Sequence, residues 1–144
     1  MHASGLSKAN RSLAEDKKIE LRVIAPAAMA KVLADTEKTA WVLTNLISNA
    51  IRYSYDHSII DIVIAETDDK IQFMVKDSGQ GIAPQYKDKI FDRYFRIPGT
   101  KKEGTGLGLS ISKEFIEAQG GKITMESEFG AGSTFSVTLN KAAS

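Results

Sequence analysis

Apolar and polar residues alternate along five segments of the chain, and this period of two is typical of half-buried β-strands. In the first segment, Ile19, Leu21 and Val23 fall on one side. The second and third segments are separated only by the polar residues Thr-Asp-Asp, which predicts a β-hairpin. The five predicted strands are 18–24, 58–66, 70–77, 122–128 and 133–140.

Apolar residues elsewhere recur at the helical spacing of three and four. The longest such segment, 35–54, begins at a plausible N-cap, Asp35 or Thr36. Its apolar stripe consists of Leu43, Leu46, Ile47, Ala50 and Ile51. A short helix is predicted from Pro84 to about Arg93, and another from about Leu107 to Gln119, ending at Gly120-Gly121. Together the elements predict an α+β two-layer sandwich, a mostly antiparallel sheet with helices on one face.

Composition fits a single globular domain. The chain has 144 residues, 42% of them apolar, and a formal net charge of +1, so a nucleic-acid partner is not expected. It contains no cysteine, which excludes disulfides and thiolate metal sites. The polar start, 1–17, reads as a tag, a linker or the end of a preceding helix and is left outside the fold. The domain is predicted to span 18–142.

A second stripe on the long helix is polar and carries Asn45, Asn49 and Arg52, which lie within about 60° on a helical wheel. A solvated outer face is one interpretation of this stripe. However, asparagine is a poor residue inside a helix, so two of them one turn apart also suggest held ligand oxygens. An amide oxygen suits Mg²⁺, and Arg52 could offset phosphate charge.

The predicted hairpin ends in Lys-Asp-Ser-Gly-Gln-Gly, where Asp77 leaves the strand and Gly79 and Gly81 follow. Ordinary turn chemistry explains such a sequence. Alternatively, the Asp77 carboxylate accepts hydrogen bonds from the exocyclic amine of a purine, and the glycines allow the base to approach the backbone.

Three glycines, Gly104, Gly106 and Gly108, stand at alternate positions just before the last predicted helix. The segment fits neither a Walker loop nor a dinucleotide fingerprint. What remains is either a turn that permits tight packing or a glycine-rich helix entrance that binds an anion. The preceding residues carry Pro98 and several cations and are typical of a mobile lid. These cations are Arg96, Lys101 and Lys102.

Four motifs in this order resemble the boxes of bacterial sensor histidine kinases: "TNLISNAIRYS", "DSGQGI", "IFDRYFR" and "GTGLGLSISK". They correspond to the asparagine box, the first glycine box, the phenylalanine box and the second glycine box. The resemblance covers roughly residues 18–140 and implies the Bergerat ATP-binding sandwich, which gyrase-type topoisomerases and MutL-type repair proteins share. It also implies ATP and Mg²⁺ as cofactors.

The resemblance assigns roles to the motif residues. Asn49 would ligate Mg²⁺ and, with Arg96, contribute to catalysis, while Asn45 and Arg52 would lie at the phosphates. Arg52 stands where the family often has lysine. The adenine would be bound by Asp77, with Tyr53 near the base or ribose. Other residues around the nucleotide or anchoring the lid would be Gly79, Gly81, Ile82, Phe91, Phe95, Lys101, Lys102, Gly104, Thr105, Gly106, Leu107 and Gly108.

A phosphate-accepting histidine is not evident. His2 lies in the excluded start, and His57 is predicted to be a surface loop residue. The resemblance therefore implies a monomeric catalytic-domain fragment that acts on a separate dimerisation domain, within a homodimeric parent that signals to a response regulator. A cytoplasmic domain is expected, with the parent cytoplasmic or anchored in the inner membrane. Two alternatives stay open: an anti-sigma-factor-type serine kinase of the same superfamily, and a nucleotide-binding module without transfer activity.

Overall fold

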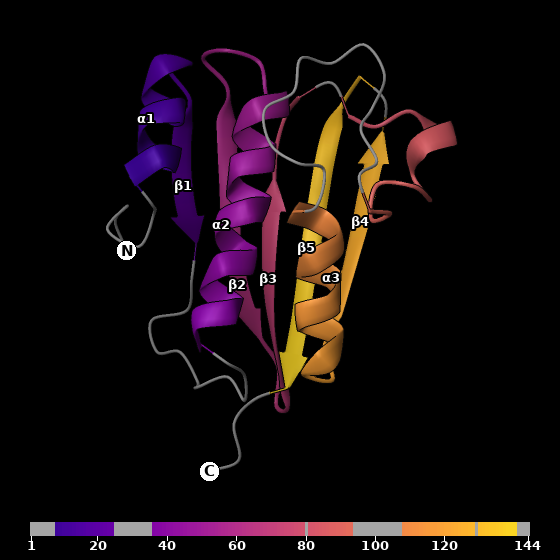
Figure 1. Cartoon of the computed structure of the whole chain (residues 1–144). Helices are drawn as coiled ribbons and strands as arrows, with labels where there is room; N and C mark the ends of the chain where they lie inside the picture. Colours follow the sequence, from indigo (N-terminus) through magenta and orange to yellow (C-terminus); the bar gives the residue numbers. More distant parts are fainter. Residues whose placement is uncertain (1–7, 25–35, 80, 94–107, 129, 141–144) are drawn as a thin grey trace.

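A five-stranded sheet with α-helices against one face forms the described part of the chain (Figure 1). The structure is a computed structural model, and it describes residues 8–24, 36–79, 81–93, 108–128 and 130–140. The elements are α1 (Lys8–Asp16), β1 (Glu20–Ile24), α2 (Thr36–Tyr53), β2 (Ile59–Glu66), β3 (Lys70–Lys76), the 3₁₀ helix η2 (Pro84–Tyr86), α3 (Gly108–Ala118), β4 (Lys122–Glu128) and β5 (Gly132–Asn140).

The strands run in the order β1-β2-β3-β5-β4. β1 and β2 are parallel, because α2 connects them, and every other neighbouring pair is antiparallel. The register places Ile62 opposite Val75 and Val75 opposite Phe135, so apolar residues of adjacent strands share one face. The predicted two-layer α+β sandwich with a mixed, mostly antiparallel sheet is confirmed.

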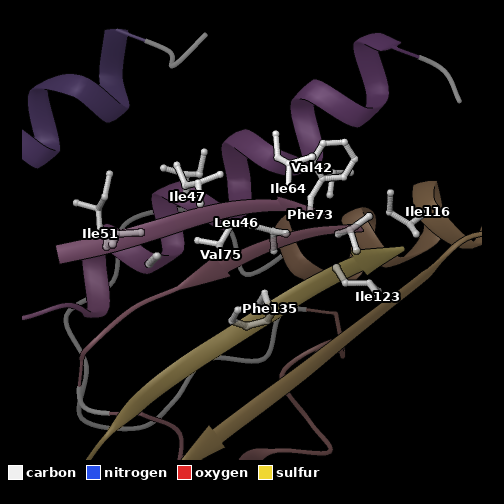
Figure 2. Packing of buried hydrophobic residues seen from close by; sticks show 14 of the residues in the cluster. Val42, Leu46, Ile47, Ile51, Ile64, Phe73, Val75, Ile116, Ile123 and Phe135 are labelled. Atoms are coloured by element: carbon white, nitrogen blue, oxygen red, sulfur yellow. The ribbon is translucent and has the colours of Figure 1, made fainter. Parts of the chain in front are cut away.

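The core lies between this sheet face and helices α2 and α3 (Figure 2). On β2, Ile60, Ile62 and Ile64 are buried while the residues between them are half-buried, as the alternation predicts. The predicted stripe of α2 is buried except Leu43, which is only partly so. Val42 is also fully buried, and the sequence analysis missed it. Around the axis of α2, Val42 lies closer to the asparagine stripe than the other buried residues of this helix do. The asparagine stripe therefore borders the core.

The opposite face of the sheet is largely polar. Arg22 on β1 and Asp61 on β2 are register partners, and the Arg22 Nε donates to the Asp61 carboxylate at 2.7 Å. The guanidinium lowers the pKa of the Asp61 carboxyl through this hydrogen bond. This ion pair lies on the sheet face away from α2 and α3, and it provides a control for experiments on the site.

One prediction about helices is wrong. The helix predicted from Pro84 to Arg93 is only the 3₁₀ helix η2, followed by turns. Bonds from the N–H of Lys89 to the carbonyl of Tyr86 and from that of Asp92 to that of Lys89 span three residues, so the segment forms consecutive tight turns. In the polar start of the chain, residues 8–16 form α1, which agrees with the helical alternative given for this segment, and Ala14 is buried in the core.

Candidate functional site

Three parts of the predicted site meet in the structure: the second half of α2, the turn after β3 and the first residue of α3. Asn45 of α2 lies against Gly108, since a Cβ atom added to this glycine would be 2.8 Å from Asn45 Oδ1. Tyr53, at the end of α2, lies against Gly79 of the turn. α2 therefore contacts both other parts of the site.

The Asn45 side chain has a fixed orientation. Its Nδ2 donates to the carbonyl of Trp41, one turn earlier, at 2.9 Å. This bond commits the amide nitrogen to the helix and turns the amide oxygen toward the start of α3. One turn later, Asn49 is half-buried, and Arg52 is exposed in the last turn of α2. The polar stripe thus runs from the α3 terminus toward solvent.

Two backbone N–H groups from different elements hold the Asp77 carboxylate. Its Oδ1 accepts a hydrogen bond from the N–H of Gly79 at 2.9 Å and from that of Ser133 at 3.2 Å. The N–H of Asp77 donates in turn to the Ser133 carbonyl at 2.9 Å. The carboxylate is therefore fixed between its own turn and the first residues of β5.

Gly79 is required by close approach rather than by turn geometry. An added Cβ would lie 2.1 Å from the Tyr53 carbonyl oxygen, which no side chain tolerates. Glycine at this position therefore lets the end of α2 touch the turn that carries Asp77. Gly81 is buried with a positive φ of 72°, which is ordinary turn chemistry.

Sequence reasoning missed three residues that support Asp77. Gly132 has a φ of 105°, and a Cβ there would lie 2.2 Å from the Asp77 carbonyl oxygen. The Ser127 hydroxyl accepts the N–H of Ile82 at 2.7 Å and lies 3.0 Å from the Ser133 hydroxyl. Both serines occupy core-facing strand positions, where an apolar residue is usual. The presence of serine at positions where the alternation predicts an apolar residue was the sequence feature that could have identified them.

Burial raises the pKa of the Asp77 carboxyl above its ordinary value, and the hydrogen bonds from Gly79 and Ser133 oppose this shift. Removal of water from an ionised carboxylate costs free energy. Carboxylates with a pKa shifted in this way are therefore found more often at functional sites than elsewhere. A carboxylate with this environment can accept a hydrogen bond from a donor on a bound molecule.

The residues present fit a magnesium ion shared with phosphates better than a metal held by protein alone. Within the described ranges, no group of three or more His, Cys, Asp or Glu side chains could hold a metal ion. Amide oxygens are available instead, on Asn45 and Asn49. Mg²⁺ prefers oxygen ligands and is commonly bound by one or two protein groups together with substrate phosphates.

The lid and most of the glycine-rich segment lie outside the described residues. These are Phe95, Arg96, Lys101, Lys102, Gly104, Thr105, Gly106 and Leu107. Just before them, Phe91 stacks edge-on against Phe135 with ring centroids 6.1 Å apart, and Lys113 Nζ lies 5.5 Å from the Phe91 ring centre. Phe91 therefore anchors the chain to the core where the predicted lid begins.

Sequence comparison finds a family and many relatives. Residues 34–143 match the family described as histidine kinase-, DNA gyrase B-, and HSP90-like ATPase. The sensor protein SrrB of Staphylococcus aureus is 42% identical over 110 residues, which cover 74% of this chain. The chain spans only 19% of the length of SrrB.

Solved structures share the fold. The catalytic domain of the histidine kinase ThkA, in a nucleotide-free form, has a TM-score of 0.80 at 29% identity over 94% of this chain and 88% of its own. The mycobacterial sensor histidine kinase MprB has the same TM-score at 22% identity over 93% of this chain and 91% of its own, a likeness of fold alone. Full-length ShkA in complex with AMPPNP has a TM-score of 0.76 at 26% identity over 94% of this chain and 30% of its own. In the part of the chain that the structure describes, no helix has the length and apolar character of a membrane span.

Proposed function

The chain belongs to the family of histidine kinase-, DNA gyrase B- and HSP90-like ATPases as a histidine kinase catalytic domain, and we propose that it binds Mg²⁺-ATP and transfers the γ-phosphoryl group to a histidine of a separate dimerisation domain. The observation that carries this proposal is the contact of α2 with both the Asp77 turn and the start of α3. ShkA, a relative in fold, was solved with AMPPNP, a nucleotide analogue, which supports ATP as the ligand.

Asp77 selects adenine in this proposal. Both backbone N–H groups bond Oδ1, so we assign the exocyclic amine of adenine to Oδ2. Guanine presents an oxygen at the equivalent position, and two acceptors would then face each other. Tyr53, Gly79, Gly81 and Ile82 are assigned to the surroundings of the base and ribose.

The phosphates are assigned to the polar stripe of α2 that carries Asn45, Asn49 and Arg52. Asn49 would hold the magnesium ion, which when bound neutralises phosphate charge, and Asn45 and Arg52 would line the same region. The start of α3 offers N–H groups and a positive dipole end to an anion, and Gly108 stands at this position. Arg96, Lys101, Lys102 and the residues from Gly104 to Leu107 complete the assignment from outside the described ranges.

Phosphoryl transfer depends mainly on position and on neutralised charge. The bond between the γ-phosphorus and the bridging oxygen of ADP breaks, and a bond from phosphorus to an imidazole nitrogen forms. His57 is exposed in the turn between α2 and β2 and is not assigned as the acceptor. The acceptor is therefore assigned to a dimerisation domain, and a response regulator is the expected next partner.

A two-chain labelling experiment tests this function. The chain is incubated with labelled ATP and Mg²⁺, alone and with the dimerisation domain of its parent kinase. We expect a label on the second chain that is lost in acid and kept in base, the stability of phosphohistidine. Strong labelling of the chain alone, or an acid-stable label on the partner, would favour a serine kinase. ATP binding without any transfer would favour a nucleotide-binding module.

A further inference from the structure

The side chain of Lys17, outside the site described so far, reaches the end of helix α2. Its ammonium donates hydrogen bonds to the carbonyls of Ile51 at 2.8 Å, Arg52 at 3.2 Å and Ser54 at 2.6 Å. An ammonium carries three N–H donors, and these three carbonyls use them all. Lys17 is half-buried, so the contact is only partly open to water.

A cation is well suited to this place. The last carbonyls of a helix lack partners within the helix, and the C-terminal end carries a partial negative charge. A lysine of the same helix often satisfies such carbonyls. In α2 the last-turn cation, Arg52, is exposed, and the ammonium comes from a residue 34 positions before Ile51.

The backbone of Lys17 is itself fixed, because it ends helix α1. The N–H of Ile19 donates to the carbonyl of Ala14 at 2.9 Å and that of Lys18 to Glu15 at 3.1 Å, the pattern of a Schellman motif. Lys18 takes the left-handed φ of 58° that this motif needs. The carbonyl of Lys17 accepts the N–H of His57 at 2.9 Å. Lys17 therefore joins the ends of two helices.

The capped end of α2 is also the part that touches the Asp77 turn. The Tyr53 carbonyl, between those of Arg52 and Ser54, is the group that an added Cβ on Gly79 would meet at 2.1 Å. The N–H of Gly79 in turn holds Asp77 Oδ1. An unbroken series of contacts thus links the Lys17 ammonium to the carboxylate assigned to adenine.

We propose that Lys17 is a positioning residue that couples helix α1 to the nucleotide site by holding the C-terminal end of α2. This inference rests on the proposed function, since it concerns the affinity of the same site for ATP. Loss of the ammonium releases three carbonyls, loosens the last turn of α2 and removes the support behind Gly79. ATP must then restore that arrangement on binding, so its affinity falls.

Three variants test the proposal. Lys17→Met keeps the stem and removes the ammonium, and Lys17→Arg restores a cation with N–H donors. Lys18→Met removes the same charge from the adjacent, exposed residue and is the matched control. The dissociation constant for Mg²⁺-ATP is measured by calorimetry below the melting temperature of each variant. Amide hydrogen exchange of residues 51–54 is measured without nucleotide.

We expect Lys17→Met to raise the dissociation constant about fivefold, within the usual range of coupling between sites. It should also speed exchange at residues 51–54, with Lys17→Arg recovering most of both effects and Lys18→Met unchanged. If Lys17→Met does not fold, Lys17→Gln, which has two donors and no charge, replaces it with the same expectation.

A purely structural role would lower the melting temperature of Lys17→Met and leave its affinity for ATP unchanged, and this result would overturn the proposal. An equal loss of affinity in Lys18→Met would overturn it as well, because the effect would then be one of charge alone. Absence of ATP binding by the unmutated chain is a different result: it would refute the proposed function, and the coupling with it.

Discussion

Replacement of Asp77 by asparagine separates the assignment to adenine from any structural role of this residue. An asparagine oxygen can still accept the N–H groups of Gly79 and Ser133, which lie 2.9 Å and 3.2 Å from Oδ1. The second oxygen becomes an NH₂ group, which donates rather than accepts. Asp77→Asn therefore keeps the support of the turn and reverses the polarity of the group that faces the base.

The cost to ATP binding follows from the hydrogen bond lost. A hydrogen bond to a charged group contributes about 1.5–3 kcal/mol, and a donor left without a partner costs about 1–3 kcal/mol more. A loss of about 3 kcal/mol corresponds to a dissociation constant raised roughly a hundredfold. ATP at about 100 times the original dissociation constant stabilises the unmutated chain by about 2.7 kcal/mol, and the same concentration would stabilise Asp77→Asn by only about 0.4 kcal/mol.

Without nucleotide, Asp77→Asn should not destabilise the protein. Because burial raises the pKa of the Asp77 carboxyl, its ionised form is disfavoured in the fold. The protonated Asp77 carboxyl makes its full contribution to stability below the unfolded-state pKa of about 3.9. This contribution is lost as the pH rises through the higher folded-state pKa. Asp77→Asn has no such loss, so its melting temperature at neutral pH should equal or exceed that of the original chain.

Thermal unfolding with and without ATP or GTP, between pH 4 and 8, measures these effects. Asp61→Asn is the matched control, on the other face of the sheet. Arg22 lowers the pKa of Asp61, so the stability from this pair is present at neutral pH and lost as the pH falls through the folded-state value. Asp61→Asn should keep ATP binding. If Asp77→Asn binds ATP normally, or the original chain responds equally to ATP and GTP, the adenine assignment is refuted.

Three further substitutions test the support of the site. Gly79→Ala places a Cβ against the Tyr53 carbonyl and should cost about 2 kcal/mol or more in urea unfolding; a loss below about 0.5 kcal/mol would contradict the close approach. Ser127→Ala leaves the N–H of Ile82 without its hydroxyl acceptor and should cost about 1 kcal/mol, and unchanged stability would mean that this bond has no weight. Asn49→Ala should abolish most of the benefit of Mg²⁺ in ATP titrations while the empty protein gains a few tenths of a kcal/mol in helix propensity; an unfolded variant would instead mark Asn49 as structural.

Patterns within a single element predicted most of the fold. The alternation of Ile60, Ile62 and Ile64 and the helical stripe of α2 each depend only on nearby residues, and both are confirmed. The prediction of a helix from Pro84 to Arg93 was wrong because it also used only local residues. Proline favours the start of a helix but does not determine how far the helix continues. Instead, hydrogen bonds between residues three positions apart form consecutive turns in this segment.

The support of Asp77 could not be predicted in this way. Ser133 is 56 residues away along the chain, and no local pattern shows which strand will lie beside the turn. Lys17 is a similar case, since a lysine next to another lysine is typical of a solvated surface. Serine at the core-facing positions 127 and 133 was a usable signal, because a buried hydroxyl needs a partner. The asparagine stripe and Asp77 were visible because their residue types are unusual for their places.

Helix α2 connects the two parts of the candidate site. Its contacts with α3 at Asn45 and with the Asp77 turn at Tyr53 are eight residues apart, or about 12 Å along the helix axis. A helix does not shorten or stretch easily, so the distance between the part assigned to phosphate and the part assigned to adenine is fixed by α2 itself. The two parts can move relative to each other only if α2 tilts or loses its last turn. Lys17 holds that last turn through the carbonyls of Ile51 and Ser54, so the proposed coupling predicts that loosening this end of α2 lowers the affinity for ATP.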